Sequence, residues 1–149
     1  MSAKSIFSSD AALLSKTHWG TLSMIDAQGK PYGIALNAVY HPEKNCLYFH
    51  CAKHGHKVEA LDAHPDVSYF ALVEETLDAP HFTTHYTSIV ARGTARLIED
   101  ESQAIEALAY LTETLAPGML ARKPGVADSC WKQCVLYRID LEEVSCKQH

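Results

Sequence analysis

The fold of this chain is decided by residues 20–51, GTLSMIDAQGKPYGIALNAVYHPEKNCLYFHC. Leu22 and Met24 alternate with polar residues, which is the two-residue period of a strand with one buried face. Turn-forming residues separate this strand from two further extended segments, at residues 32–40 and 46–51. Three consecutive strands joined by short turns favour an antiparallel barrel over a doubly wound sheet.

The rest of the chain is expected to add three strands and three helices. The strands are predicted at residues 67–74, 86–98 and 135–141, and the helices from a Ser9–Asp10 cap to Lys16, between Gly55 and His64, and between Asp100 and Leu115. Residues 67–74 are apolar at both alternating positions, which predicts a central strand buried on both faces. Gly93, inside a strand, predicts a bend, a bulge or a close approach. Residues 116–132 are expected to form a loop.

Length and composition set the class of protein. The chain has 149 residues, 47% of them hydrophobic, which is enough to bury the core of one domain. We therefore expect a single mainly β (α+β) domain over residues 1–149, with six antiparallel strands and peripheral helices. Intrinsic disorder and a disulfide-stabilised miniprotein are disfavoured by the same composition.

Charge, cysteine content and targeting signals bear on partners and compartment. The formal charge of −5 disfavours nucleic acids and anionic membranes as partners. Five cysteines without framework spacing, behind a start that lacks a secretory signal, are typical of reduced thiols in a cytoplasm. No apolar stretch approaches the ~18 residues that a membrane span needs. We expect a cytoplasmic protein without a membrane segment.

The densest set of candidate functional residues is YFHCAKHGHK at residues 48–57, where a strand leads through a glycine turn into a helix. Helix amides and a nearby ammonium such as that of Lys57 favour a phosphate. A solvated turn without any ligand has the same composition. A metal is a weaker interpretation of His50, His54 and His56, because their spacing matches no metal motif, and we expect no metal site.

The segments YGIALNAVY (32–40), LYFHC (47–51) and GHK (55–57) together resemble the FMN-binding split barrels related to pyridoxamine 5'-phosphate oxidase. Within that family they are most similar to the nitroimidazole-resistance and flavin-nucleotide-binding proteins. The resemblance extends over roughly residues 16–144. It implies a split β-barrel, FMN as cofactor and a homodimer with shared sites.

The resemblance also implies roles for individual residues. Lys57 is expected to bind the FMN phosphate, and His50 and Cys51 to line the cofactor at the strand end. The remaining cofactor contacts are expected from Asn37, Ala38, Val39 and Ser88, and from Trp131 of the second subunit. Tyr32 stands where true pyridoxamine phosphate oxidases carry a phosphate-binding arginine, so synthesis of pyridoxal phosphate is not expected. His56 replaces the first lysine of the family's Gly-Lys-Lys turn.

The function that this resemblance implies is an FMN-dependent oxidoreductase. It would take electrons from NADH or NADPH and pass them to a small acceptor, with a nitroaromatic compound as one candidate. His50 is the candidate catalytic residue. Two alternatives stay open: a flavin store or redox sensor without turnover, and a haem-binding split barrel in which a histidine ligates iron.

Overall fold

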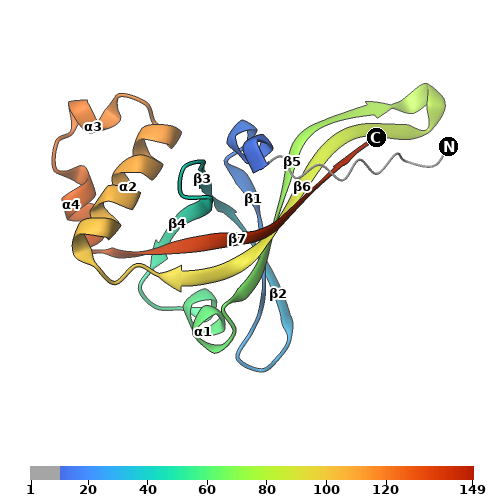
Figure 1. Cartoon of the computed structure of the whole chain (residues 1–149). Coiled ribbons are helices and arrows are strands. Elements are labelled where there is room, and N and C mark those ends of the chain that lie inside the picture. Colours follow the sequence, from blue (N-terminus) through green and yellow to red (C-terminus); the bar gives the residue numbers. More distant parts are fainter. Residues whose placement is uncertain (1–10) are drawn as a thin grey trace.

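The structure is a computed structural model that describes residues 11–149. It contains a single seven-stranded antiparallel sheet with the order β2-β1-β5-β6-β7-β4-β3 (Figure 1). The elements are η1 (Ala11–Lys16), β1 (Trp19–Ile25), β2 (Pro31–Asn37), β3 (Val39–His41), β4 (Cys46–Ala52), α1 (His56–Ala63), β5 (Asp66–Asp78), η2 (Ala79–His81), β6 (Thr83–Leu97), α2 (Glu101–Leu115), α3 (Met119–Arg122), α4 (Val126–Trp131) and β7 (Cys134–Gln148). The predicted Ser9–Asp10 cap lies outside the described residues.

The predicted fold class is confirmed, with seven strands in place of six. The expected single strand at residues 32–40 divides at Ala38, so that β2 pairs with β1 whereas β3 pairs with β4. The backbone N–H of Ala38 donates to the carbonyl of His18 at 3.1 Å, which ties the break to the start of β1. Because β2 and β3 are the two edges of the sheet, this break is where the barrel is split.

Two apolar clusters fill the molecule. One occupies the interior of the curved sheet and includes Leu22, Phe49, Tyr69 and Tyr137. The other lies between the sheet and α2, and contains Val39, Tyr48, Leu136, Ala104, Ala107, Leu108 and Leu111. The predicted helix at residues 101–115 is confirmed, and its Asp100 cap accepts a hydrogen bond from the Gln103 amide at 2.9 Å.

The prediction that residues 67–74 are buried on both faces is wrong. Val67, Tyr69 and Ala71 point into the core, whereas Phe70 and Leu72 are 42% and 44% exposed. Helices α2, α3 and α4 gather at the other end of the sheet, and no element of residues 11–149 covers the outer face around Phe70 and Leu72 (Figure 1). The ends of β5, β6 and β7 instead project together as an arm.

Gly93 fulfils the expectation of a close approach. The register of β6 with β7 shifts between Arg92 and Gly93. A Cβ atom on Gly93 would lie 2.0 Å from the carbonyl oxygen of Asp140 on β7. Only a residue without a side chain fits there unless the two strands move apart.

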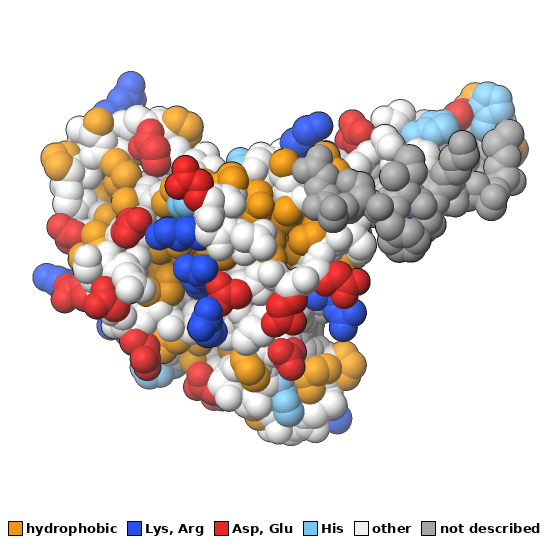
Figure 2. All heavy atoms as spheres, in the orientation of Figure 1, with side chains coloured by type: hydrophobic (Ala, Val, Ile, Leu, Met, Phe, Trp, Pro, Cys, Tyr) orange, Lys and Arg blue, Asp and Glu red, His pale blue; other side chains and the backbone are white. Residues whose placement is uncertain are grey.

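The segment at residues 116–132 is not the loop that the sequence predicted, because it contains the short helices α3 and α4. Leu120 and Trp131 pack from these helices against the cluster around α2, which gives the segment an apolar face to bury. No helix of the described chain is long and apolar enough to cross a membrane. On the face that Figure 2 shows, basic and acidic side chains are interspersed, in keeping with the net charge of −5.

Candidate functional site

The candidate site lies where β4 leaves the sheet, at the split of the barrel. Val39 of β3 pairs with Tyr48 of β4, and two further steps of this ladder would bring Asn37 opposite His50. Asn37 belongs instead to β2, which turns away to pair with β1. The split therefore opens between Asn37 and His50. A short turn after Ala52 then leads from β4 into α1.

The pleat of β4 sends neighbouring side chains to opposite faces. Phe49 and Cys51 belong to the cluster inside the sheet, whereas Tyr48 faces the cluster around α2. His50 follows Tyr48 by two residues and lies on the same side as that tyrosine. The structure thus places His50 and Cys51 together at the strand end but on its two faces.

Lys57 stands in the first turn of α1 and reaches back toward β4. Its Nζ lies 5.9 Å from the centroid of the Phe49 ring. No side chain caps α1 in the described structure, so its first amides stay available to an anion. Gly55 precedes the helix with φ +134°, and a Cβ there would meet nothing within 4 Å. The approach to these amides is therefore open.

His56 does not share the orientation of Lys57. Its Nε2 lies 3.6 Å from Oδ2 of Asp26, and its ring makes an edge contact with Tyr32 at 4.5 Å between centroids. The backbone amides of Gln28 and Lys30 donate to the Asp26 carboxylate at 2.9 Å, and the Lys30 bond is the largest cause of its lowered pKa. His56 thus helps to fix α1 against the β1–β2 hairpin.

The electrostatic surroundings keep both candidate groups on β4 uncharged near neutral pH. Burial lowers the pKa of His50, and the positive charge of Lys57 lowers it further. Burial raises the pKa of the Cys51 thiol, while Lys57 opposes that rise. A neutral imidazole and a protonated thiol follow from these directions.

His50 borders a pocket of about 430 Å³ between β4, α2 and the segment before β7. The pocket is lined by His50, Cys51, Ala52, Leu108, Leu111, Thr112, Cys130, Gln133 and Cys134. Trp131 lies nearby and lines a neighbouring pocket with Lys53 and Cys134. The structure therefore brings Trp131 to the same end of the molecule as the His50 of its own chain.

The three residues expected beside the flavin ring differ in exposure. Asn37 is exposed, and its Nδ2 donates to the carbonyl of His18 at 3.0 Å. Ala38 and Val39 are 1% and 0% exposed, so their side chains belong to the core. They can border a ligand through backbone atoms only.

Ser88 is not brought to this site within one chain. Ser88 pairs with Lys147 of β7, whereas His50 pairs with Leu136 of the same strand. The two positions on β7 are eleven residues apart, which corresponds to ~36 Å along an extended strand. Ser88 lines a different pocket, of about 630 Å³, on the outer side of β5, β6 and β7.

That outer pocket belongs to a larger apolar face, formed by Phe70, Leu72, Leu77, Tyr86 and Val90. The bulge between Leu72 and Glu74 keeps these side chains on one side of the arm. The opposite side of the arm is polar, and Thr87 there donates a hydrogen bond to Glu74 at 2.9 Å. The arm is therefore amphipathic.

Two buried polar groups near the split were not among the residues that the sequence analysis singled out. The Tyr137 hydroxyl and His18 Nδ1 are buried without a hydrogen-bond partner in the described structure. The Tyr137 ring stacks on Phe49 at 5.2 Å between centroids, and burial raises its pKa to about 12. In sequence Tyr137 is one more alternating strand residue. Only the pairing of β4 with β7 places it next to the ring beneath Lys57.

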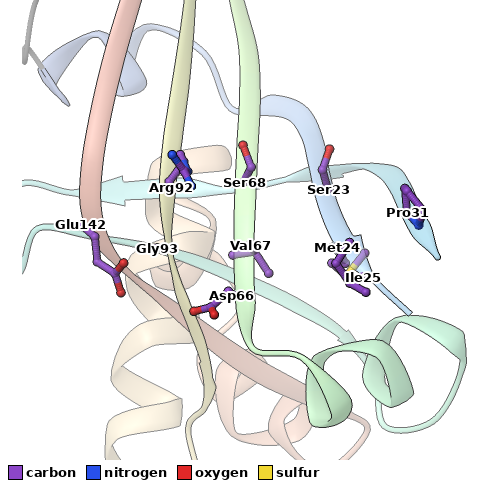
Figure 3. Close-up of a pocket in the computed structure, with 10 residues that line it drawn as sticks. All are labelled: Ser23, Met24, Ile25, Pro31, Asp66, Val67, Ser68, Arg92, Gly93 and Glu142. Atoms are coloured by element: carbon purple, nitrogen blue, oxygen red, sulfur yellow. The ribbon is translucent and has the colours of Figure 1, made fainter. Parts of the chain in front are cut away.

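A further pocket of about 470 Å³ contains none of the predicted site residues (Figure 3). Ser23, Ser68 and Arg92 project into it from the neighbouring strands β1, β5 and β6. Arg92 is paired with Glu143 at 3.3 Å. Within residues 11–149, no group of three or more His, Cys, Asp and Glu side chains is arranged to hold a metal ion.

Comparison with known families shows a match over nearly the whole chain. Residues 11–148 match the model of the family described as pyridoxamine 5'-phosphate oxidase. No curated protein sequence matches the chain.

Several solved structures share the fold. A candidate 5-nitroimidazole antibiotic resistance protein from Bacteroides thetaiotaomicron has a TM-score of 0.81 at 19% identity, over 99% of this chain and 89% of that one. An FAD and haem binding protein from Mycobacterium smegmatis has a TM-score of 0.77 at 19% identity, over 95% and 72%. An FAD-binding protein from Mesorhizobium loti has a TM-score of 0.69 at 22% identity, over 93% and 91%.

Proposed function

This chain belongs to the pyridoxamine 5'-phosphate oxidase family, and from that premise we propose that it is an FMN-binding oxidoreductase. It takes electrons from NADH or NADPH and passes them to a small acceptor, for which a nitroaromatic compound is the first candidate. The fold neighbours include proteins that bind FAD and one that is a candidate for 5-nitroimidazole resistance.

The observation that carries this proposal is the arrangement of α1 and β4. The uncapped helix start, the open glycine turn and the half-buried Lys57 form a cradle whose groups all favour an anion. A phosphate monoester fits this donor set, because amides and an ammonium satisfy its oxygens together. A charge-assisted hydrogen bond from Lys57 would contribute ~1.5–3 kcal/mol to its binding.

Bound FMN supplies the hydride and electron transfer, and the chain supplies position and protons. Asn37 and His50 stand on the two sides of the split and would flank the flat ring. His50 is neutral near pH 7, so a ring N–H can donate to the oxygen or nitrogen of an acceptor. The pocket of about 430 Å³ next to His50 has room for a small molecule.

The proposed assembly is a homodimer in which the apolar face of the arm is covered by a second copy. Phe70, Leu72 and Leu77 are 42%, 44% and 74% exposed on this face, and a water-exposed strip of large side chains is costly. Ser88 lies on the same face and far from His50 of its own chain. It can contribute to a flavin site only across the interface. The placement of Trp131 toward the partner's cofactor belongs to the same proposal.

Haem is the second candidate ligand, because one fold neighbour binds both FAD and haem and because His50 borders a pocket and is neutral near pH 7. An imidazole in that state can ligate iron. The absorption spectrum separates the candidates: flavin has two bands in the near ultraviolet and blue, and haem has one intense Soret band.

Turnover is tested by following NADH and NADPH oxidation with the FMN-loaded protein and a nitroaromatic acceptor under nitrogen. We expect oxidation of one donor that depends on the acceptor and falls at least tenfold in His50→Ala, with FMN still bound. A fully loaded protein that oxidises neither donor with any acceptor tried would be a flavin store or sensor, and the oxidoreductase proposal would be wrong.

A further inference from the structure

Two cysteines meet at the pocket beside His50. Cys130 lies in α4 and Cys134 is the first residue of β7, and both line the pocket. Lys132 between them keeps a helical backbone, with φ −68° and ψ −20°, and the Gln133 amide donates to the Cys130 carbonyl at 2.9 Å. Cys134 follows this turn directly, so the two cysteines stand at its two ends. A disulfide between them would bring their Cβ atoms to ~4 Å from each other.

The two thiols differ in their exposure to solvent, and this difference suits one of them to react first with an oxidant and the other to form the disulfide afterwards. Cys130 is exposed, so an oxidant in solution reaches it directly. Cys134 is half-buried, and its pKa is raised by burial and by the neighbouring Cys130 and Cys51, while Lys53 opposes the rise. Cys130 is thus the thiol that is oxidised first, and Cys134 is the partner that resolves it.

The other three cysteines are poorly placed to compete. Cys46 and Cys146 are buried in the core. Cys51 lies next to Cys134 along the sheet, but Cys51 is opposite Val135 in the β4–β7 ladder and packs into the inner cluster. Cys134 is one residue removed from Val135 and packs against the cluster around α2. The pleat therefore directs the two side chains to opposite faces of the sheet, although both border the pocket at its end.

We propose that Cys130 and Cys134 are a site of reversible disulfide formation that a hydroperoxide oxidises. The Cys130 thiolate attacks one peroxide oxygen, the O–O bond breaks, and a sulfenic acid and water form in the case of hydrogen peroxide. The Cys134 thiol then attacks that sulfur, the S–S bond forms, and the hydroxyl leaves as a second water. The two thiols supply the two electrons and two protons that reduce one peroxide to two waters.

The disulfide would alter the pocket without involving the flavin. It would tie the end of α4 to the start of β7, on the wall that faces His50 and α2. The size of the pocket beside His50 would then depend on whether Cys130 and Cys134 are reduced or joined by a disulfide. A dithiol reductant would restore the reduced pair.

The test is a thiol count on the purified full-length protein before and after treatment with hydrogen peroxide, followed by peptide mapping. We expect the five thiols to fall to three, with a peptide that joins Cys130 to Cys134 and a return to five after dithiothreitol. Cys51→Ser is the matched control, because Cys51 also borders the pocket, and it should still lose two thiols. Cys130→Ser and Cys134→Ser should form no disulfide within the chain. A link that involves Cys51, a link between two chains, or five surviving thiols would overturn the proposal.

Discussion

Replacement of Lys57 by Met probes the phosphate cradle with the least disturbance of packing. Methionine keeps much of the apolar stem over Phe49 and removes only the ammonium, which lies 5.9 Å from the Phe49 ring. The half-buried position limits screening by solvent, so the loss is that of one charge-assisted contact, about 2 kcal/mol. Affinity for FMN should therefore fall ~30-fold.

Lys53→Met is the matched control, since Lys53 is the same kind of residue four positions earlier. Lys53 is exposed and lines the pocket of Trp131, whereas Lys57 stands in the first turn of α1. A screened surface charge of this kind should change FMN affinity by less than ~threefold. Fluorescence titration of FMN into both apo variants at one salt concentration measures the difference, with thermal melts to verify folding. Equal affinities would falsify the assignment of Lys57, and a larger loss for Lys53 would reverse it.

Three further predictions concern the frame around the site. Gly93→Ala should destabilise the apoprotein by ~3 kcal/mol in urea unfolding, because its Cβ would lie 2.0 Å from a backbone oxygen, whereas Gly33→Ala, with its nearest atom at 3.5 Å, should cost under ~1 kcal/mol. Similar losses for the two would contradict the close approach. The pKa of His50, measured by NMR titration, should lie below 6.5 and should rise when Lys57 is replaced by Met. Because the folded state disfavours the imidazolium of His50, the free energy of unfolding should decrease as the pH falls below 6.5. An unchanged His50 pKa in Lys57→Met would refute the effect of the Lys57 charge on His50. Light scattering should give twice 16.5 kDa for the wild type and a shift toward 16.5 kDa for Leu72→Asp, whereas a flavin-loaded wild-type monomer would exclude the dimer.

Local sequence patterns predicted the strands and helices that are determined by neighbouring residues in the chain. The two-residue alternation around Leu22 and Met24 gave β1, and the Asp100 cap with an apolar stripe up to Leu111 gave α2. The close approach at Gly93 could be predicted because a glycine inside a strand often marks a bulge or a close contact with another backbone. The family resemblance was likewise confirmed by the match over residues 11–148.

Features that depend on pairing between strands distant in sequence could not be predicted from local sequence patterns. The break at Ala38 comes from competition between β1 and β4 for one extended segment, and nothing in residues 32–40 marks it. Phe70 and Leu72 have the composition of a buried strand, yet the chain offers no described element to cover them. The contact of Tyr137 with Phe49 likewise requires the register of β7 with β4.

The central claim is that the chain holds FMN between α1 and β4, and the most direct test is to identify the ligand that the purified protein releases on denaturation. Mass spectrometry of the filtrate, together with the absorption spectrum of the intact protein, should show FMN and two flavin bands. The fraction of protein that carries FMN should fall in Lys57→Met but not in Lys53→Met. A Soret band with released haem, or a colourless protein that does not take up added FMN, would contradict the account.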